Sequence, residues 1–571
     1  MQQWMLYTKR ADFNEISARF LILPYTARIM VNRDIKEDEM EMFLRPDIGA
    51  LHSPYLLEGI KEAALFLKNK ILSNKSILIV GDYDIDGVCS TYIYYSALKK
   101  LGACVDYVIP DRIKDGYGIN KSIINEAAYR GIDTVLTCDN GISAFEALSY
   151  GKSLGLNIIV TDHHEVFKDE NGQDRLPEAD IVIDPKKSTC TYPYKEICGA
   201  MVAYKLVKAL YGLYGIEESE VFTEFEDFVS IATVGDVMPL RDENRIILKQ
   251  SLKRLKNTKN IGLLKLIEVC SLNSKQITSF DIGFIIGPCI NAGGRLESAE
   301  TALRLFISDK EDEAVNLALH LKELNDERKA LTLKNFNIAV EQVEKLYLND
   351  KILVVYLKDC HESLAGIIAG RLRERYYKPV FVLTDTQEGT LKGSGRSIEN
   401  YDMFKGLCSA DIYLLKYGGH KMAAGLSLER EKLEQFRKYL NENCTLSEDD
   451  LKEKIWIDIA LPFSYITIDF LKELELLEPF GAGNAKPAFA GRDIEILSAR
   501  VFGSERNVVK LKVKGSDGFV IDALVFTDGD KFIKECQEYK YMSAVFYPQI
   551  NDYMGRKNIE LIIRHYKFTG N

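Results

Sequence analysis

A short segment with three closely spaced acids constrains this chain more than any other part of its sequence. Residues 77–87 read ILIVGDYDIDG, and the apolar run 77–80 is typical of a buried central strand. Asp82, Asp84 and Asp86 follow at every second position. Carboxylates this close repel one another, and burial strengthens the repulsion, which a hard divalent cation relieves by taking their oxygens as ligands. The segment therefore predicts a cation site at a strand end, the alternative being an acidic turn with solvated side chains.

The length and composition are those of a globular protein with several domains. At 571 residues we expect two to four domains, and 46% hydrophobic and 28% charged residues are ordinary values. No apolar run is long enough to span a membrane and the N-terminus lacks a signal-peptide core, so we expect a cytoplasmic protein without a membrane partner. The eleven scattered cysteines, with no CxxC pair, are interpreted as thiols in a reducing cytosol. The net charge of −10 argues mildly against nucleic acid, although local patches decide binding.

The first half of the chain alternates strand and helix patterns. We expect strands at 77–80, 105–109, 134–137, 157–160 and 181–183, with helices between them, for example at 88–101 and 143–154. This alternation predicts an α/β domain with a mainly parallel sheet and helices on both faces. Residues 196–345 are mostly helical, and 310–346 predict one long charged amphipathic helix, or two helices, that could act as a spacer.

The second half changes character twice. A smaller α/β segment begins with the apolar run 351–357. From about residue 453 the pattern becomes a series of short strands, such as VVKLKVKG and FVIDALVF, which predicts a small β-barrel or sandwich. The predicted parts are an N-terminal segment (1–53), an α/β domain with its helical connector (54–345), a second α/β domain (346–450) and a β domain (451–571).

Further acids follow other strands of the predicted parallel sheet. Strand 134–137 is followed by CDNG, which contains Asp139, and strand 157–160 by TDHHE, which contains Asp162, His163 and His164. The carboxyl ends of parallel strands lie at one edge, where open α/β sheets bind their ligands. A fourth acid, Asp236, lies in VGDVMPL after a buried helical segment, where glycine permits close backbone approach and proline ends the helix.

Each of these motifs alone is ordinary, since an aspartate after a strand is usually a helix cap and adjacent histidines are usually not a metal pair. Their convergence on one sheet edge is not ordinary. Five or six oxygens and one or two imidazoles fit a two-metal hydrolytic site in which a shared hydroxide attacks phosphorus. A mixed oxygen and nitrogen shell favours manganese or magnesium, with cobalt as an alternative, over a structural zinc.

The four motifs DYDIDG, CDNG, TDHHE and VGDVMPL resemble, in order and spacing, those of the DHH phosphoesterase superfamily. Within it the chain is most similar to the RecJ family of single-stranded-DNA exonucleases. IGPCINAGGRLESA (286–299), GSGRS (393–397), YGGHKMAAGLSL (417–428) and LEPFGAGNAKPAF (477–489) extend the resemblance over nearly the whole chain. It implies a DHH domain, a DHH-associated domain and a C-terminal OB-like domain that grips the strand. It also implies 5′-to-3′ digestion of single-stranded DNA to 5′-mononucleotides in repair and recombination.

The resemblance further implies a set of site residues and two divalent ions, Mn²⁺ or Mg²⁺. Asp139 would bridge the two ions, and Asp82 would lie beside the first, where some superfamily members use a histidine at the position of Val80. His164 would face the scissile phosphate, and Asp162 would orient a histidine. The catalytic candidates are therefore His164, Asp139 and Asp82. The implied metal ligands are Asp84, Asp86, Asp139, His163 and Asp236.

Several basic or polar residues are candidates for phosphate contacts. In GSGRS, backbone amides, Ser394 and Arg396 could cradle a phosphate, the alternative being a surface turn. His420 of the GGH motif and Arg295 of NAGGR could also bind a phosphate. In the helical run 371–375 a solvated face is equally consistent, and Arg371 is the arginine expected to point inward.

The C-terminal region contains an alternating basic strand. Lys510, Lys512 and Lys514 would lie on one face, with Arg500 and Arg506 just upstream. Such a face suits a single-stranded nucleic-acid backbone, whereas the alternative is an edge strand protected by lysine against aggregation. The thirty tyrosines give no identifiable stacking residue.

Two other functions remain open at the level of sequence. A small-substrate phosphodiesterase or pyrophosphatase of the same superfamily would not need the β region 453–571. A non-catalytic DNA-binding scaffold would lack acids in the motifs, and here all four are filled. Single-stranded DNA is the expected partner, and a single-stranded-DNA-binding protein and a helicase are further candidates from the resemblance.

Overall fold

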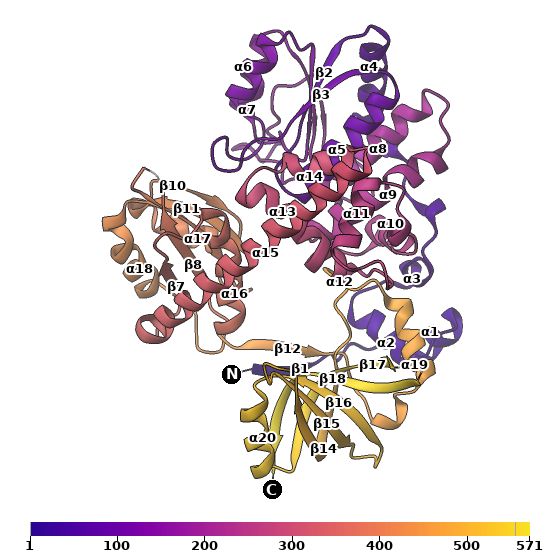
Figure 1. Cartoon of the computed structure of the whole chain (residues 1–571), viewed down its shortest axis with the longest axis vertical. Helices are drawn as coiled ribbons and strands as arrows, with labels where there is room; N and C mark the ends of the chain where they lie inside the picture. Colours follow the sequence, from indigo (N-terminus) through magenta and orange to yellow (C-terminus); the bar gives the residue numbers. More distant parts are fainter. Residues whose placement is uncertain (1, 387, 554–555, 571) are drawn as a thin grey trace.

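The strands expected between residues 77 and 183 form one sheet in the computed structural model, which describes residues 2–386, 388–553 and 556–570 (Figure 1). All neighbouring strands are parallel, in the order β3-β2-β4-β5-β6, so the prediction of a parallel sheet is confirmed. The strands are β2 (Ser76–Val80), β3 (Cys104–Val108), β4 (Thr134–Cys138), β5 (Asn157–Thr161) and β6 (Ile181–Ile183).

Helices cover both faces of this sheet, as the alternation predicted. Successive side chains of a strand point to opposite faces. Ile77 and Ile79 therefore join a large core with α4, α5 and α8, whereas Leu78 and Val80 pack in a smaller core against α6 and α7. These helices are α4 (Ile60–Leu72), α5 (Ile85–Lys100), α6 (Lys121–Tyr129), α7 (Phe145–Ser153) and α8 (Gly199–Gly212).

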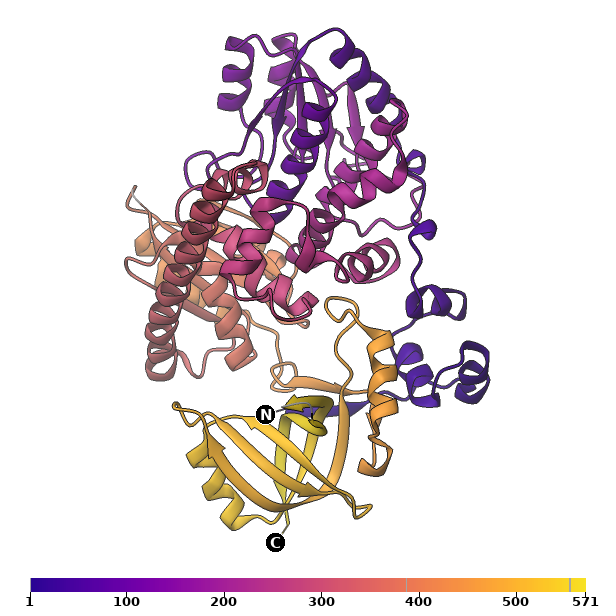
Figure 2. The same cartoon turned by 45° about the vertical axis from the view of Figure 1, so that its right-hand side comes forward.

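The expected long helix is a single element, α15 (Glu311–Gln342), followed by one π-helical turn. Leu321 near its middle belongs to the core of the first domain, and Ala339 near its end belongs to the core of the second, so the helix connects the two (Figure 2). No helix in the described part of the chain is both long and apolar enough to cross a membrane. The preceding helices are α9 (Glu218–Gly235), α10 (Asp242–Ser251), α11 (Ile261–Val269), α12 (Ser279–Asp281), α13 (Gly287–Leu296) and α14 (Glu300–Ile307).

The second α/β region is a mixed sheet with the order β10-β11-β9-β8-β7. Only β7 and β8 are parallel, and the other pairs are antiparallel. One core forms with α15 and α16 and the other with α17 and α18. The elements are β7 (Leu353–Tyr356), α16 (Ala365–Tyr376), β8 (Val380–Asp385), β9 (Leu391–Arg396), α17 (Met403–Ser409), β10 (Lys416–Gly419), β11 (Ala423–Leu428) and α18 (Leu433–Glu442).

The C-terminal strands close into a ring, which confirms the expected small barrel. The order is β13-β14-β15-β16-β18-β17, and the long strand β14 pairs with β17 to close it. The elements are β12 (Glu453–Ile457), β13 (Ile459–Ala460), α19 (Ile468–Leu474), β14 (Phe489–Phe502), β15 (Val508–Lys514), β16 (Val520–Phe526), α20 (Gly529–Glu538), β17 (Tyr541–Tyr553) and β18 (Arg556–Thr569).

The N-terminal segment belongs structurally with the far end of the chain. β1 (Gln2–Leu6) pairs in parallel with β12, as Figure 1 shows where the indigo and orange strands meet. Ile29 and Met30 are fully buried in one core with Phe470 and Leu474 of α19. The N-terminal helices are α1 (Phe13–Phe20), α2 (Pro24–Asn32) and α3 (Glu37–Leu44).

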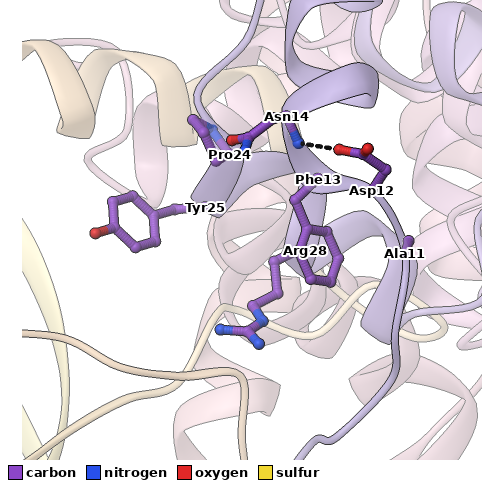
Figure 3. A pocket seen from close by; sticks show the side chains of 7 residues that line it. All are labelled: Ala11, Asp12, Phe13, Asn14, Pro24, Tyr25 and Arg28. Atoms are coloured by element: carbon purple, nitrogen blue, oxygen red, sulfur yellow. Dashed lines mark hydrogen bonds between the residues drawn. The ribbon is translucent and has the colours of Figure 1, made fainter.

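A surface hollow lies beside the first two of these helices (Figure 3). Arg28 packs 5.0 Å from the ring centre of Phe13, and the Asp12 carboxylate caps α1 by accepting from the amide of Asn14 at 3.1 Å. None of the acids of the four motifs lines it. The functional residues therefore gather elsewhere.

Candidate metal centre and phosphate site

The motif acids meet at the carboxyl edge of the first sheet. Asp139 directly follows β4, Asp162 and His163 directly follow β5, and Asp82 lies two residues beyond β2. Because parallel strands end at a common edge, these side chains come together despite their separation in sequence.

His163 lies at the centre of one group of carboxylates. Its Nε2 is 3.1 Å from Asp139 Oδ1, 3.5 Å from Asp86 Oδ2 and 3.6 Å from Asp236 Oδ2. Burial lowers the pKa of His163 to about 3, so the imidazole is neutral and can act as a ligand. Asp86, His163 and Asp236 each offer one ligand atom within 4.8 Å of the others.

Asp139 also belongs to a second group. Oxygens of Asp82, Asp84 and Asp139 lie within 4.8 Å of one another. A carboxylate shared between two ligand groups would serve as the bridge if both groups held a cation. The position upstream, Val80, is fully buried in the sheet core, so Asp82 and Asp84 are the residues that would supply the other oxygens of this group.

The second and third acids of DYDIDG lie at the N-terminus of α5, just beyond the end of β2. Asp84 is the N-cap of α5, and its Oδ1 accepts from the amides of Asp86 at 3.0 Å and Gly87 at 3.1 Å. Asp86 in the first turn accepts from the amides of Gly199 at 2.6 Å and Ala200 at 2.8 Å, at the start of α8. Two helix N-termini thus point at the acids and partly offset their charge.

Glycines allow these elements to approach so closely. A Cβ on Gly199 would lie 2.7 Å from Asp139 Cβ, and one on Gly235 would lie 2.4 Å from Ile85 Cγ2. Gly235 therefore permits the close approach of α9 to α5 that the sequence suggested, and it brings Asp236 to the site.

Asp139 has a strained backbone. Its φ is +61°, a left-handed conformation that is uncommon for residues other than glycine. The amide of Asp139 donates to Thr161 O at 3.1 Å, and its carbonyl accepts from the Tyr117 hydroxyl at 2.9 Å. Such strain persists only where neighbouring contacts enforce it, and it is concentrated at functional sites.

The pKa values of the buried acids indicate that cations would stabilise their ionised forms. These acids are Asp82, Asp86, Asp139 and Asp236. Burial first, and neighbouring carboxylates second, raise the pKa of Asp86 to about 6 and that of Asp236 to about 8. The same causes raise the pKa values of Asp82 and Asp139 well above the ordinary range. Asp82 Oδ1 is buried without a hydrogen-bond partner. An oxygen-rich set with one imidazole and no thiolate fits two hard divalent ions.

His164 differs from its neighbour in exposure and charge. Its side chain is 43% exposed, and its Nδ1 is 2.7 Å from Asp162 Oδ1. Burial alone would lower the pKa of His164. The hydrogen bond to Asp162 and the charges of Asp162, Asp236 and Asp86 together raise it to about 9. Although burial acts to raise it, the pKa of Asp162 is about 2, chiefly because of His164. His164 is thus held as a cation by Asp162. Ligand atoms of His164, His163 and Asp139 also lie within 4.8 Å of one another, whereas Asp162 belongs to no such group among the described residues.

Ser394 and Arg396 lie on strand β9, which excludes the surface turn that was the alternative for GSGRS. The backbone of GSGRS pairs with β8 and β11, so its amides serve the sheet and the side chains remain for phosphate. Arg396 Nη1 donates to Ser394 Oγ at 3.1 Å. A Cβ on Gly366 of α16 would come within 3.0 Å of both side chains, so this glycine leaves room for them.

The GGH motif lies at the same end of that sheet. Arg396 pairs with Ala423 of β11, and Ala424 next to it pairs with Gly419 of β10. His420, at the turn between these strands, is exposed. Ser394, Arg396 and His420 are thus brought to one end of the second sheet.

Arg295 bridges the two α/β regions. Its Nη1 donates to Ser363 O at 2.8 Å, across to the second region. The glycine before it packs α13 against the DYDIDG segment, since a Cβ on Gly294 would lie 2.3 Å from Tyr83 O. Burial, and then the charges of Arg112 and Arg328, lower the pKa of Arg295 to about 10.

In the helical run 371–375, Arg373 is the more buried arginine, whereas Arg371 was expected to point inward. Arg371, expected to point inward, is exposed, and its charge acts on Arg328. Arg373 is half-buried with a partnerless Nε, and its charge acts on Arg396. The charges of Arg295, Arg328, Arg371, Arg373 and Arg396 act on one another, so these five arginines form a positive wall, and Arg295 is the member on which the charge of Asp84 acts.

Arg112 and Tyr117, in the loop after β3, are site residues that the sequence patterns did not predict. The Arg112 guanidinium lies 3.9 Å from the Tyr83 ring centre, and its Nε donates to Gly294 O at 3.1 Å. Tyr117 OH is 3.2 Å from His164 Nδ1. The signal was available: DRIKDGYG follows the carboxyl end of a sheet strand, and both its glycines have positive φ.

The three lysines of the basic strand β15 lie on one face, as expected, but two of them already contact carboxylates. β15 buries Val509, Leu511 and Val513, so its three lysines lie together on the other face. Lys510 pairs with Asp522 at 3.2 Å, Lys514 approaches Glu495 at 3.8 Å, and Arg506 pairs with Asp530 at 2.5 Å. Lys512 and Arg500 are exposed and have no ion pair within the described residues.

The fold and the site define a DHH-family phosphoesterase. The DHH family N-terminal domain matches residues 76–233, the DHHA1 domain 349–445 and the RecJ OB domain 457–565. The chain belongs to the RecJ family.

Individual relatives and solved structures are consistent with this family membership. The single-stranded-DNA-specific exonuclease RecJ of Bacillus subtilis (strain 168) is 35% identical over 95% of this chain and 68% of its own length. That of Escherichia coli (strain K12) is 32% identical over 89% of this chain and 90% of its own. The crystal structure of RecJ in complex with Mn²⁺ from Thermus thermophilus superposes with a TM-score of 0.83 at 27% identity, covering 100% of this chain and 80% of that one.

The two histidines should affect metal binding differently. His163 is buried among three carboxylates, whereas His164 is exposed and bound to Asp162. We expect His163→Ala to weaken Mn²⁺ binding on the order of 10–100-fold, and His164→Ala to leave it nearly unchanged. Isothermal titration calorimetry without substrate measures both, and the opposite ranking would exchange the two roles.

Stabilisation by metal should grow with pH. In the metal-free protein the raised pKa values of Asp86 (about 6) and Asp236 (about 8) give stability that is present at low pH and lost as pH rises through them. A bound cation removes that repulsion and competes with those protons. We expect a larger Mn²⁺-induced rise in Tm at about pH 8 than at about pH 5.5. Equal rises at both values would contradict it.

Proposed function

We propose that this chain is a metal-dependent exonuclease that hydrolyses phosphodiester bonds of single-stranded DNA. The observation that carries the proposal is the Asp139 carboxylate, shared by two groups of ligand atoms at a sheet edge. Membership of the RecJ family supports the substrate class. Crystal structures of the Thermus thermophilus relative with Mn²⁺ and with Mg²⁺ support the choice of metals.

Two sets of residues would each hold one of the two ions. Asp82, Asp84 and Asp139 would hold one ion, and Asp139 with Asp86, His163 and Asp236 the other. When bound, such a pair supplies an activated water and polarises the scissile phosphate. The chain's own residues then fix where the strand lies and where charge accumulates.

His164 is the group placed to meet the reacting phosphate. Asp162 Oδ1 lies 2.7 Å from its Nδ1, so Nε2, which is 3.3 Å from the Tyr117 hydroxyl, is the nitrogen that would donate to the substrate. A protonated imidazole there can donate to a non-bridging oxygen as negative charge develops on it. Tyr117 also holds the Asp139 carbonyl, so it links this donor to the bridging acid.

The positive wall is placed to hold the end of the strand. Arg295 links the two α/β regions and is acted on by the charge of Asp84, whereas Ser394, Arg396 and His420 lie at one end of the second sheet. Guanidinium groups suit a terminal phosphate because they bind two oxygens at once. The family resemblance makes that end the 5′ end, which gives 5′-to-3′ digestion and 5′-mononucleotide products.

The barrel distinguishes this proposal from its alternatives. A phosphodiesterase or pyrophosphatase for small substrates has no need of residues 457–565, which match the RecJ OB domain. A non-catalytic scaffold has no need of a buried, mutually repelling acid set. Cytoplasmic DNA repair and recombination, with a single-stranded-DNA-binding protein and a helicase as partners, follow from the resemblance and form part of the proposal.

The direct test is digestion of single-stranded DNA labelled at one end or the other, with and without Mn²⁺. We expect metal-dependent loss of the 5′ label first and no cleavage of a duplex. Asp139→Asn should reduce the rate by at least about 100-fold while folding normally, because asparagine also tolerates positive φ. Asp38→Asn, an exposed acid of α3, is the control. Near-normal digestion by the Asp139 variant would refute the two-metal assignment.

Arg396→Ala should impair short and long strands alike. It should also reduce the advantage of a 5′-phosphorylated end, because the lost guanidinium no longer binds that phosphate. Arg375→Ala, an exposed arginine of the same region, serves as the matched control. Rates on paired 5′-phosphate and 5′-hydroxyl oligonucleotides measure the effect, and an unchanged ratio would remove Arg396 from the terminal site.

Neutralising Lys510, Lys512 and Lys514 together should weaken binding of long strands and flatten its salt dependence. Because two of the three lysines already contact carboxylates, the slope of log K against log salt should change by less than the roughly 2 expected for three free phosphate contacts. Cleavage of a very short oligonucleotide should be unaffected. The control is the same change at Lys259, Lys310 and Lys345, and equal salt slopes would exclude this face as the strand grip.

A further inference from the structure

The motif LEPFGAGNAKPAF has no part in the mechanism above, yet its first half is held by the DHH domain. Residues 476–485 form a loop between α19 and β14. The amide of Leu240, four residues after Asp236, donates to Ala482 O at 2.8 Å. Ser279 Oγ, at the start of α12, donates to Phe480 O at 2.6 Å. The loop therefore contacts the catalytic region at two places.

Cations of α10 fix the loop through its backbone carbonyls. Arg245 is 1% exposed, and its Nη2 donates to Leu476 O at 2.9 Å and to Glu478 O at 2.8 Å. Lys249 Nζ also donates to Leu476 O at 3.0 Å. A buried guanidinium is tolerated only where its donors are satisfied, so these carbonyls hold one position relative to α10.

Two glycines permit the contact at the end of the VGDVMPL motif. A Cβ on Gly481 would lie 2.7 Å from Leu240 Cδ1. Gly483 has φ +65°, and its Cβ would lie 3.1 Å from Pro239 Cβ. Any side chain at either position would push on the Pro239–Leu240 segment.

Only a short tight turn separates that segment from Asp236. α9 ends at Gly235, before the proline, and Asp236 caps it with its amide donating to Ala232 O at 2.8 Å. Val237 then takes φ +58°, and the amide of Met238 donates to Thr233 O at 3.0 Å. A turn this constrained transmits a shift at Leu240 to Asp236.

We propose that the loop 476–485 is a positioning element for the Asp236 carboxylate. Docking of the C-terminal domain and cation binding are then coupled, and the coupling is reciprocal: a bound cation strengthens docking, and docking strengthens cation binding. The inference rests on the metal centre of the proposed function. It extends that function by making the C-terminal domain part of the metal site as well as a binding surface.

The test is Mn²⁺ binding, without DNA, by the full-length variants Gly483→Ala and Gly518→Ala. Gly518 is the matched control because it lies in the same domain, has φ +85° and would bring its Cβ within 4 Å of nothing. We expect Gly483→Ala to lose on the order of tenfold in Mn²⁺ affinity by calorimetry. Gly518→Ala should bind as the wild type does. Equal affinities in the two variants would overturn the proposal.

Two further measurements keep the proposal testable if Gly483→Ala fails to fold. Gly481→Ala meets only the flexible Leu240 side chain, so the same loss of affinity, smaller in size, is expected. In the wild type, Mn²⁺ should slow hydrogen exchange at residues 239–241 and 476–485, and unchanged exchange there would also overturn the proposal. Failure of the proposed function would appear as a wild type without Mn²⁺-dependent digestion, whereas failure of this inference leaves that activity intact.

Discussion

The repulsion among buried carboxylates at the edge of the first sheet is the constraint on which the rest of the structure depends. Asp82, Asp86 and Asp139 are almost completely buried, and burial together with the charges of neighbouring carboxylates raises the pKa of each. Without compensation such a cluster would take up protons or move apart. The N-termini of α5 and α8 and the left-handed backbone of Asp139 hold it in place, and bound cations would complete the balance of charge.

The same constraint explains the opposite charge across the site. The acids come from the carboxyl edge of the first sheet and from the ends of α5 and α9, and the arginines of the positive wall come from α13, α15 and the second α/β region. A phosphate carries negative charge and binds cations, so it fits between a metal-loaded acid edge and an arginine wall. His164 adds a half-exposed cation on the acid side of the site, where Asp162 Oδ1 lies 2.7 Å from its Nδ1.

The C-terminal domain is tied to this centre more closely than its place at the end of the chain implies. It shares a core with the N-terminal helices, and its loop 476–485 is bound by α10 and by the segment that follows Asp236. The basic face of β15 is partly neutralised by Asp522 and Glu495. Its contribution to strand binding therefore depends on fewer free charges than the lysine spacing suggests.

The sequence by itself determined the parallel sheet, the long helix, the barrel and the convergence of the four acid motifs. These follow from local patterns: buried strands are apolar runs, and parallel strands end at one edge whatever lies between them. The face shared by three alternating lysines follows from the two-residue period of a strand in the same way.

Only the tertiary structure decided how those pieces are used. Asp84 caps α5 and Asp86 lies in its first turn, where the N-termini of α5 and α8 stabilise their charges, and the alternation of acids in the sequence does not reveal this. The exposure of Arg371, the contacts of Arg112 and Tyr117 and the ion pairs of the lysine face depend on residues brought together from different elements. The pairing of β1 with β12 joins segments about 450 residues apart, and no local pattern records a partner at that distance. Periodicity specifies which side of an element is buried, whereas the packing of elements specifies what it is buried against.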